Sequence, residues 1–164
     1  MNNKYEILNK FEDALNLLDA YDHQNVKAIK GNKSINTLSY DESRDIINSM
    51  KFNDSSDVFG IEKEEGKLNG ILLSIEQTAF GNEIYSSAEE KASNLLYFLV
   101  KDHPFVDGCK RIAAALFVIY LDKNNICTIS NGTLVSLILL IAESRAEEKD
   151  IMIKVIMSIL FHKM

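Results

Sequence analysis

The sequence has few of the residues that point to a cross-linked or metal-stabilised protein. Its 164 residues include two cysteines, Cys109 and Cys127, too few for a disulfide framework or a structural zinc site. The three histidines show no metal-ligand spacing. We therefore expect a protein without disulfide or metal cross-links that resides in a reducing compartment, the cytoplasm.

Runs long enough for a membrane and clusters of positive charge are also missing. The most apolar stretches, residues 112–121 and 134–142, are too short to span a bilayer, so we interpret them as helices buried on most sides. The N-terminus lacks the basic-then-apolar layout of a signal peptide. A net charge of −6 argues against a surface that coats nucleic acid. We expect neither membrane nor nucleic acid as a partner.

The periodicity of apolar residues predicts an all-α bundle with one small hairpin. Serines followed three residues later by glutamates form capping boxes at Ser39, Ser87 and Ser144. The expected helices cover residues 3–21, 39–50, 67–75, 87–102, 109–124, 133–143 and 147–161. The Gly81-Asn82 pair predicts a hairpin turn within residues 77–85. We expect a single domain over 1–164, with N-terminal helices and loops over 1–65 and the core over 66–164.

One loop carries glycine and lysine without carrying a phosphate-binding motif. Residues 30–34 read Lys-Gly-Asn-Lys-Ser, but the required upstream glycine and a preceding strand are missing. We interpret this stretch as a surface loop.

The segment from His103 to Arg111 is the place where chemistry concentrates. It reads His-Pro-Phe-Val-Asp-Gly-Cys-Lys-Arg, contains the only proline of the chain, and separates two expected helices. A helix N-terminus attracts anions, and Gly108 lets the backbone approach a phosphate closely. Arg111 adds a planar fork for phosphate oxygens, Asp107 can hold Mg²⁺, and imidazole titrates near neutral pH. The combination predicts chemistry on a nucleotide.

This segment closely resembles the Fic/Doc (Fido) signature, His-Pro-Phe-x-(Asp/Glu)-Gly-Asn-(Gly/Lys)-Arg, with affinity to the RhuM-type virulence-associated branch. The resemblance implies a Fic/Doc-like helical bundle of a bacterial cytoplasmic protein. It implies transfer of AMP or phosphate from ATP, with Mg²⁺, to a Ser, Thr or Tyr hydroxyl of a target protein. In that branch such a segment can follow another domain, so this chain is interpreted as a possible piece of a longer protein.

The resemblance also assigns roles by position. His103 would be the general base and Asp107 the magnesium ligand, while Phe105 would anchor the loop in the core. The nucleotide phosphates would bind at four consecutive residues: Gly108, Cys109, Lys110 and Arg111. The hairpin would be a flap on which the target adds a strand, at Thr78, Ala79, Phe80, Gly81 and Asn82.

Two departures from the signature keep alternatives open. Ala114 stands where the Fic pattern has a second arginine, which with Lys110 favours Doc-like phosphoryl transfer over AMP transfer. Cys109 replaces the asparagine, and one hypothesis is that a low thiol pKa makes it a thiolate that repels phosphates. The alternatives are a tolerated substitution and a degenerate fold that binds nucleotide or protein without turnover.

No strict match to the inhibitory helix of many Fic proteins occurs, because Ser86…Glu90 and Ser144…Glu148 are each followed by lysine. Any restraint is expected from outside this segment, as in a toxin held by an antitoxin.

Overall fold

The computed structural model describes residues 5–126 and 129–162, so Cys127 lies outside the described part. The regular secondary structure of the described residues consists of helices and one short antiparallel hairpin, which confirms the predicted fold class. The elements are η1 (Glu6–Phe11), α1 (Glu12–Asp22), α2 (Tyr40–Ser49), η2 (Lys51–Asp54), α3 (Lys67–Ser74), β1 (Thr78–Ala79), β2 (Asn82–Glu83), α4 (Ala88–Lys101), α5 (Cys109–Lys123), α6 (Asn131–Glu143), η3 (Ala146–Glu148) and α7 (Lys149–His162).

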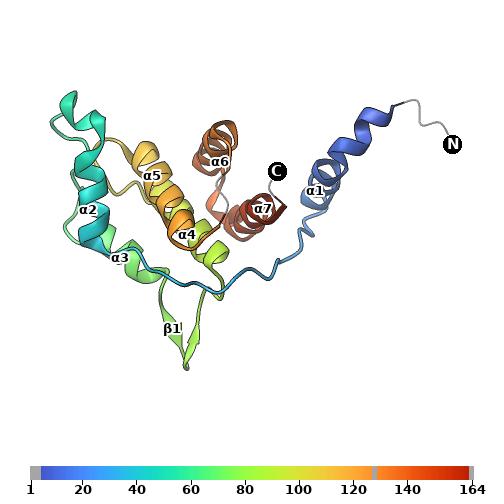
Figure 1. Cartoon of the computed structure of the whole chain (residues 1–164), viewed down its shortest axis with the longest axis horizontal. Coiled ribbons are helices and arrows are strands. Elements are labelled where there is room, and N and C mark those ends of the chain that lie inside the picture. Colours follow the sequence, from blue (N-terminus) through green and yellow to red (C-terminus); the bar gives the residue numbers. More distant parts are fainter. Residues whose placement is uncertain (1–4, 127–128, 163–164) are drawn as a thin grey trace.

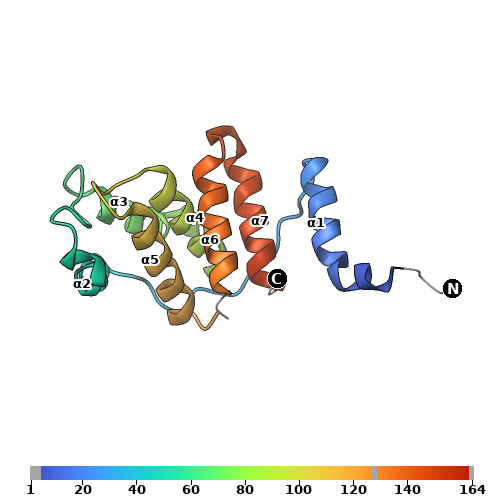
Figure 2. The ribbon, with the colours of Figure 1, turned by 90° about the horizontal axis from the view of Figure 1, so that it is seen from above.

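Helix α4 is the centre of the molecule, because α3, α5, α6 and α7 all pack against it (Figure 2). It buries eleven of its fourteen residues. Leu95, Leu96 and Leu99 are fully buried, as are Ile112 and Leu116 of α5. The two helices that flank the His103–Arg111 segment therefore form the rigid core on which that segment is mounted.

Two of the three predicted serine caps begin helices at the expected places, although their glutamates bond elsewhere, Glu42 to Lys123 and Glu90 to Ser86. The Ser39 hydroxyl accepts the Glu42 amide at 3.1 Å, and the Ser87 hydroxyl accepts the Glu90 amide at 3.1 Å. The third prediction is wrong by one residue. A 3₁₀ turn precedes α7, and the Glu148 carboxylate accepts the Arg145 amide at 3.0 Å.

The prediction that α6 is buried on most sides is also wrong. Only Leu137, Ile138 and Ile141 are buried along it, whereas Val135 and Leu139 are about half exposed. Other helices cover one side of α6, so apolar side chains on its other side remain exposed. No helix in the described residues is long and apolar enough to cross a membrane.

Residues 24–38 form an extended strap that crosses the ends of α4 and α5 and joins α1 to α2 (Figure 1). The Asn124 side chain accepts the amides of Ile35 and Asn36 at 2.8 and 3.0 Å. The Asn32 amide donates to the Glu89 carboxylate at 2.7 Å. The predicted surface loop is thus hydrogen-bonded along its length rather than free.

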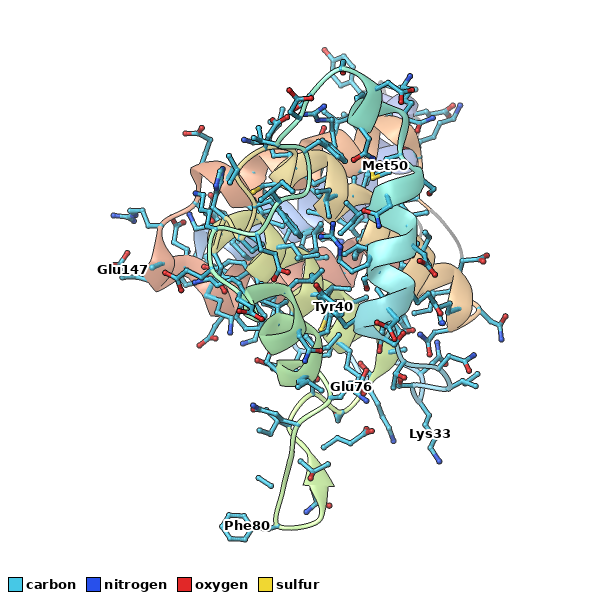
Figure 3. The ribbon with its side chains drawn as sticks, turned by 90° about the vertical axis from the view of Figure 1, so that its left-hand side faces the viewer. Lys33, Tyr40, Met50, Glu76, Phe80 and Glu147 are labelled. Carbon is cyan, nitrogen blue, oxygen red and sulfur yellow. The ribbon has the colours of Figure 1, made fainter. Side chains whose placement is uncertain are left out.

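The hairpin projects away from the body, with Phe80 fully exposed at its tip (Figure 3). Its base is held by Lys91 of α4, whose side chain is 2 % exposed. The Lys91 ammonium donates to Glu76 at 2.8 Å and to Glu83 at 2.9 Å. Burial acts to lower the pKa of Lys91, but these two hydrogen bonds and the charges of the two glutamates together outweigh it and raise the pKa.

Candidate active site

The His103–Arg111 segment forms a loop, here called the motif loop, that joins the C-terminal end of α4 to the N-terminal end of α5. Phe105 is fully buried, which confirms its predicted anchoring role. His103 is exposed and has a φ of 49°, a left-handed conformation that costs a non-glycine residue free energy. The surrounding structure therefore holds His103 at the surface in an unfavourable backbone conformation.

A second stretch, the bridging segment (residues 56–63), runs beside the motif loop. Short β-bridges pair Phe59 with Asp107 and Glu62 with Phe105. Three backbone hydrogen bonds accompany them: Gly60 N to Asp107 O at 3.0 Å, Val106 N to Ile61 O at 2.8 Å, and Lys63 N to Pro104 O at 2.9 Å. The loop is thereby fixed by main-chain contacts that do not depend on its exposed side chains.

Glu62 connects the bridging segment to two helices. One carboxylate oxygen accepts the Leu68 amide at 2.7 Å, which satisfies a free amide in the first turn of α3. The other accepts the Tyr40 hydroxyl at 3.2 Å. The segment beside the motif loop is therefore fastened to both α2 and α3.

Gly108 is required by both conformation and space. Its φ is 92°, and a Cβ atom there would lie 2.4 Å from Cε2 of Phe59. Gly108 is the N-cap of α5 and has no side chain to satisfy the first-turn amides. The N-terminus of α5 thus keeps free amides and a partial positive charge, which favour an anion.

Arg111 is exposed and oriented by its neighbours. Its guanidinium lies over the rings of Phe52 and Phe59, 4.6 and 5.1 Å from their centroids, and donates to Asp107 at 3.1 Å. Stacking on aromatic faces limits the rotamers of the side chain. Lys110 is exposed beside it. Two cations therefore flank the free amides of α5, where a helix dipole disfavours them unless an anion is present.

Asp107 has hydrogen-bond partners on both carboxylate oxygens. One accepts from Arg111 and the other accepts the Ser56 hydroxyl at 3.0 Å. The described residues include no group of three or more His, Cys, Asp or Glu side chains that would hold a metal alone. A single, partly exposed carboxylate fits Mg²⁺, which takes one or two carboxylates together with phosphates and water.

The His103 ring has a partner that the sequence did not suggest. Nδ1 of His103 lies 2.8 Å from Nζ of Lys63, at the end of the bridging segment. Both Lys63 and His103 are exposed residues, so this contact lies at the protein surface.

The interpretation of Cys109 as a thiolate is wrong. The side chain is 5 % exposed, and its thiol donates to the Phe105 carbonyl at 3.3 Å. Burial raises the pKa of Cys109, although the charges of Lys63 and Lys110 act in the opposite direction. Only the backbone amide of Cys109 remains to face a phosphate.

The hairpin lies before α4 in the chain, whereas the motif loop lies after it. Residues 78–82 precede the N-terminal end of α4, whereas His103 follows its C-terminal end. Fourteen helical residues separate the two ends, about 20 Å at the rise of an α-helix. The placement gives no support to strand addition at the hairpin beside His103. The stretch beside the loop is the bridging segment.

Sequence reasoning missed Ser56, Phe59 and Lys63, because residues 53–66 lie between two expected helices in a polar stretch without periodicity. The available signal was the apolar pair Val58-Phe59 followed by Gly60 inside that polar stretch. Such a pattern is typical of a short extended segment that packs on a neighbour.

Comparison with known families agrees with the motif loop and extends beyond it. The model of the Fic/DOC family matches residues 33–121, which is more than half of the chain. The chain belongs to the Fic/DOC family. The matched range runs from the strap to the end of α5 and includes the bridging segment and the whole motif loop. Searches of curated proteins and of solved structures gave no match. Membership in the Fic/DOC family gives a fold whose members in general carry out nucleotide transfer.

Proposed function

We propose that this chain transfers a phosphate-containing group from a nucleoside triphosphate to a hydroxyl group of a target protein. ATP is the nucleotide with which the proposal is tested. One observation carries the proposal. An exposed imidazole, His103, is held in a strained conformation beside the uncapped N-terminus of α5, whose first turn presents Lys110 and Arg111. A proton acceptor and an anion site thus share one short loop.

The reaction requires an attacking hydroxyl, a base and a leaving group. A Ser, Thr or Tyr hydroxyl of the target forms a bond to phosphorus, and its proton passes to His103. In AMP transfer the bond to the β-phosphate breaks and pyrophosphate leaves. In phosphoryl transfer the bond to the γ-phosphorus breaks and ADP leaves. The amides of α5 and the Arg111 guanidinium stabilise the phosphate charge.

The residues around Arg111 favour transfer of the γ-phosphoryl group. The position three residues beyond Arg111 is Ala114, so that turn of α5 offers one guanidinium rather than two. Asp107 would hold Mg²⁺, which supplies neutralisation of phosphate charge when bound. Release of Asp107 from Arg111 would accompany binding, since the guanidinium would then pair with phosphate.

The deciding experiment uses ATP labelled at the α- or the γ-phosphate, with Mg²⁺ and a bacterial lysate as the source of targets. We expect label on protein from γ-labelled ATP with wild-type chain and none with His103→Ala. His23→Ala is the matched control, because His23 is also exposed but lies at the end of α1.

Each other outcome has a defined meaning. Label from α-labelled ATP assigns AMP transfer. Label that does not depend on His103, or no label at all, contradicts the transferase proposal. Heat of Mg·ATP binding without label would indicate a nucleotide-binding module.

A further inference from the structure

The contact between Lys63 and His103 restricts what the imidazole can do. Nζ of Lys63 lies 2.8 Å from Nδ1 of His103. An ammonium group has three donors and no lone pair, so Nδ1 must accept this hydrogen bond. In a neutral imidazole only one nitrogen carries a proton, and that proton must therefore be on Nε2.

In this arrangement neither ring nitrogen is ready to take a proton from a hydroxyl. The lone pair of Nδ1 is engaged with Lys63, and Nε2 already carries hydrogen. A general base needs a free lone pair within hydrogen-bond reach of the hydroxyl. His103 can therefore act as a base only after the Lys63 ammonium has moved away.

The backbone of Lys63 is hydrogen-bonded in place, whereas its ammonium group stands at the end of a long, exposed side chain. The Lys63 amide donates to the Pro104 carbonyl at 2.9 Å, which keeps the residue beside the motif loop. The ammonium sits on a flexible four-carbon stem in an exposed position. Its charge also acts on Cys109, in the first turn of α5, so it lies within electrostatic range of the anion site.

We propose that Lys63 is a positioning residue that holds His103 in a resting state and releases it when nucleotide phosphates take over the ammonium group. A phosphate oxygen forms a charge-assisted hydrogen bond with ammonium and carries a negative charge that neutral imidazole lacks. The first part of the proposal, called the hold, is that Lys63 occupies Nδ1 of His103, and it rests on the observed contact alone. The second part, called the release, is that phosphates draw the ammonium away, and it rests on the proposed nucleotide site.

The hold is tested without nucleotide, by ¹⁵N NMR of the histidine rings in the full chain. His103→Ala identifies the His103 signals among those of three histidines. We expect wild-type His103 to carry its proton on Nε2, and its Nδ1 resonance to shift in Lys63→Met but not in Lys67→Met. Lys67 begins α3 and serves as a matched loss of charge. An unchanged Nδ1 resonance in Lys63→Met overturns the hold.

The release is tested by adding Mg·ATP to the same samples. We expect the wild-type Nδ1 resonance to move toward its position in Lys63→Met, and the variant to change less. In the transfer assay, Lys63→Met should raise KM for Mg·ATP about tenfold, through loss of a hydrogen bond to a charged group. It should leave kcat within roughly twofold, because His103 is free in both saturated proteins. Lys63→Arg, which keeps the charge, should restore most of the affinity.

The outcomes separate this inference from the proposed function. Mg·ATP that binds by calorimetry without moving the Nδ1 resonance overturns the release, while the transferase proposal stands. No binding heat overturns the nucleotide site and the release together, while the apo NMR result decides the hold on its own.

Discussion

Helices α1 and α4 carry apolar residues at similar helical spacing, yet the fold covers one and leaves the other exposed. Helix α4 buries eleven of its fourteen residues. Neither η1 nor α1 buries any, and Phe11, Leu15 and Leu18 are each about half exposed. A cavity of about 800 Å³ lies between α1 and the pair α6 and α7. Periodicity thus indicates a helix, whereas the degree of burial depends on what the rest of the chain places against it.

The motif loop lies in the part of the molecule that packs around α4, and this position determines how much stability the loss of its buried side chains costs. The loop joins α4 to α5, and its buried residues pack into the same core. The N-terminal arm, defined as η1 and α1, touches the body chiefly through α7. We therefore expect substitutions of the buried residues of the motif loop to cost far more stability than substitutions in the N-terminal arm.

The largest effect is expected for Phe105→Ala. The ring is fully buried, and truncation of such a phenylalanine costs about 3–5 kcal/mol of unfolding free energy. Val106→Ala is the neighbouring control, since Val106 is 49 % exposed and should change stability by less than about 0.5 kcal/mol. Urea denaturation followed by circular dichroism measures both. Equal losses for the two variants would contradict the assignment of Phe105 as the anchor.

The second largest effect is expected for Gly108→Ala, which should destabilise the protein, whereas its control should stabilise it. Alanine at a φ of 92° and 2.4 Å from the Phe59 ring should cost about 1–3 kcal/mol. Gly70 lies within α3 with open space around it, so Gly70→Ala should stabilise the protein by about 0.5–1 kcal/mol. Thermal unfolding of the two variants checks the prediction. Stabilisation by Gly108→Ala would mean that the loop has another conformation.

Cys109 should react slowly with thiol reagents at neutral pH. Burial raises its pKa, so the thiol stays protonated and shielded. Two proteins with one thiol each are compared: Cys127→Ser, which keeps only Cys109, and a variant that lacks both native cysteines and carries Val106→Cys. We expect iodoacetamide to label Cys109 at least about tenfold more slowly than the cysteine at position 106.

The same pKa shift has a consequence for stability at high pH. A thiol whose folded pKa exceeds its unfolded value of about 8.5 contributes stability below that value. This contribution is lost as pH rises through the folded pKa. Cys109→Ala should therefore show a weaker loss of stability above about pH 8.5 than the wild type. Identical pH profiles would exclude this role for Cys109.

The smallest effect is expected in the N-terminal arm. Leu15 is 48 % exposed, and Leu15→Ser should change the unfolding free energy by less than about 0.5 kcal/mol. The matched change in α4, Leu95→Ser, removes a fully buried leucine and should cost several-fold more. Chemical denaturation compares the pair. A loss above about 1 kcal/mol for Leu15→Ser would show that something covers the N-terminal arm.

Local sequence signals predicted most of the helices and the centre of the site. The serine caps at Ser39 and Ser87 act within one turn, so spacing alone reveals them. The motif loop was found because its candidate functional residues lie within nine consecutive positions. The cap before α7 was predicted one residue too early. Ser144 and Arg145 are each followed three residues later by a glutamate, and spacing alone does not distinguish the two.

The bridging segment and the state of Cys109 could not be predicted in the same way. Lys63 is forty positions from His103, and only the tertiary pairing brings the two together. The burial of Cys109 depends on how Phe105 enters the core, which no local pattern encodes. The hairpin itself was predicted from its turn residues, whereas its separation from His103 by the length of α4 depends on how the helices are arranged.

Glu62 gives the site a mechanical property. One carboxylate holds the start of α3 and the Tyr40 hydroxyl, while the backbone of the same residue pairs with Phe105. Any displacement of the loop that carries His103 must stretch at least one of these links. The loop of the proposed phosphate site and helices α2 and α3 thus share one acidic residue as a common attachment, although neither helix carries any of the proposed chemistry.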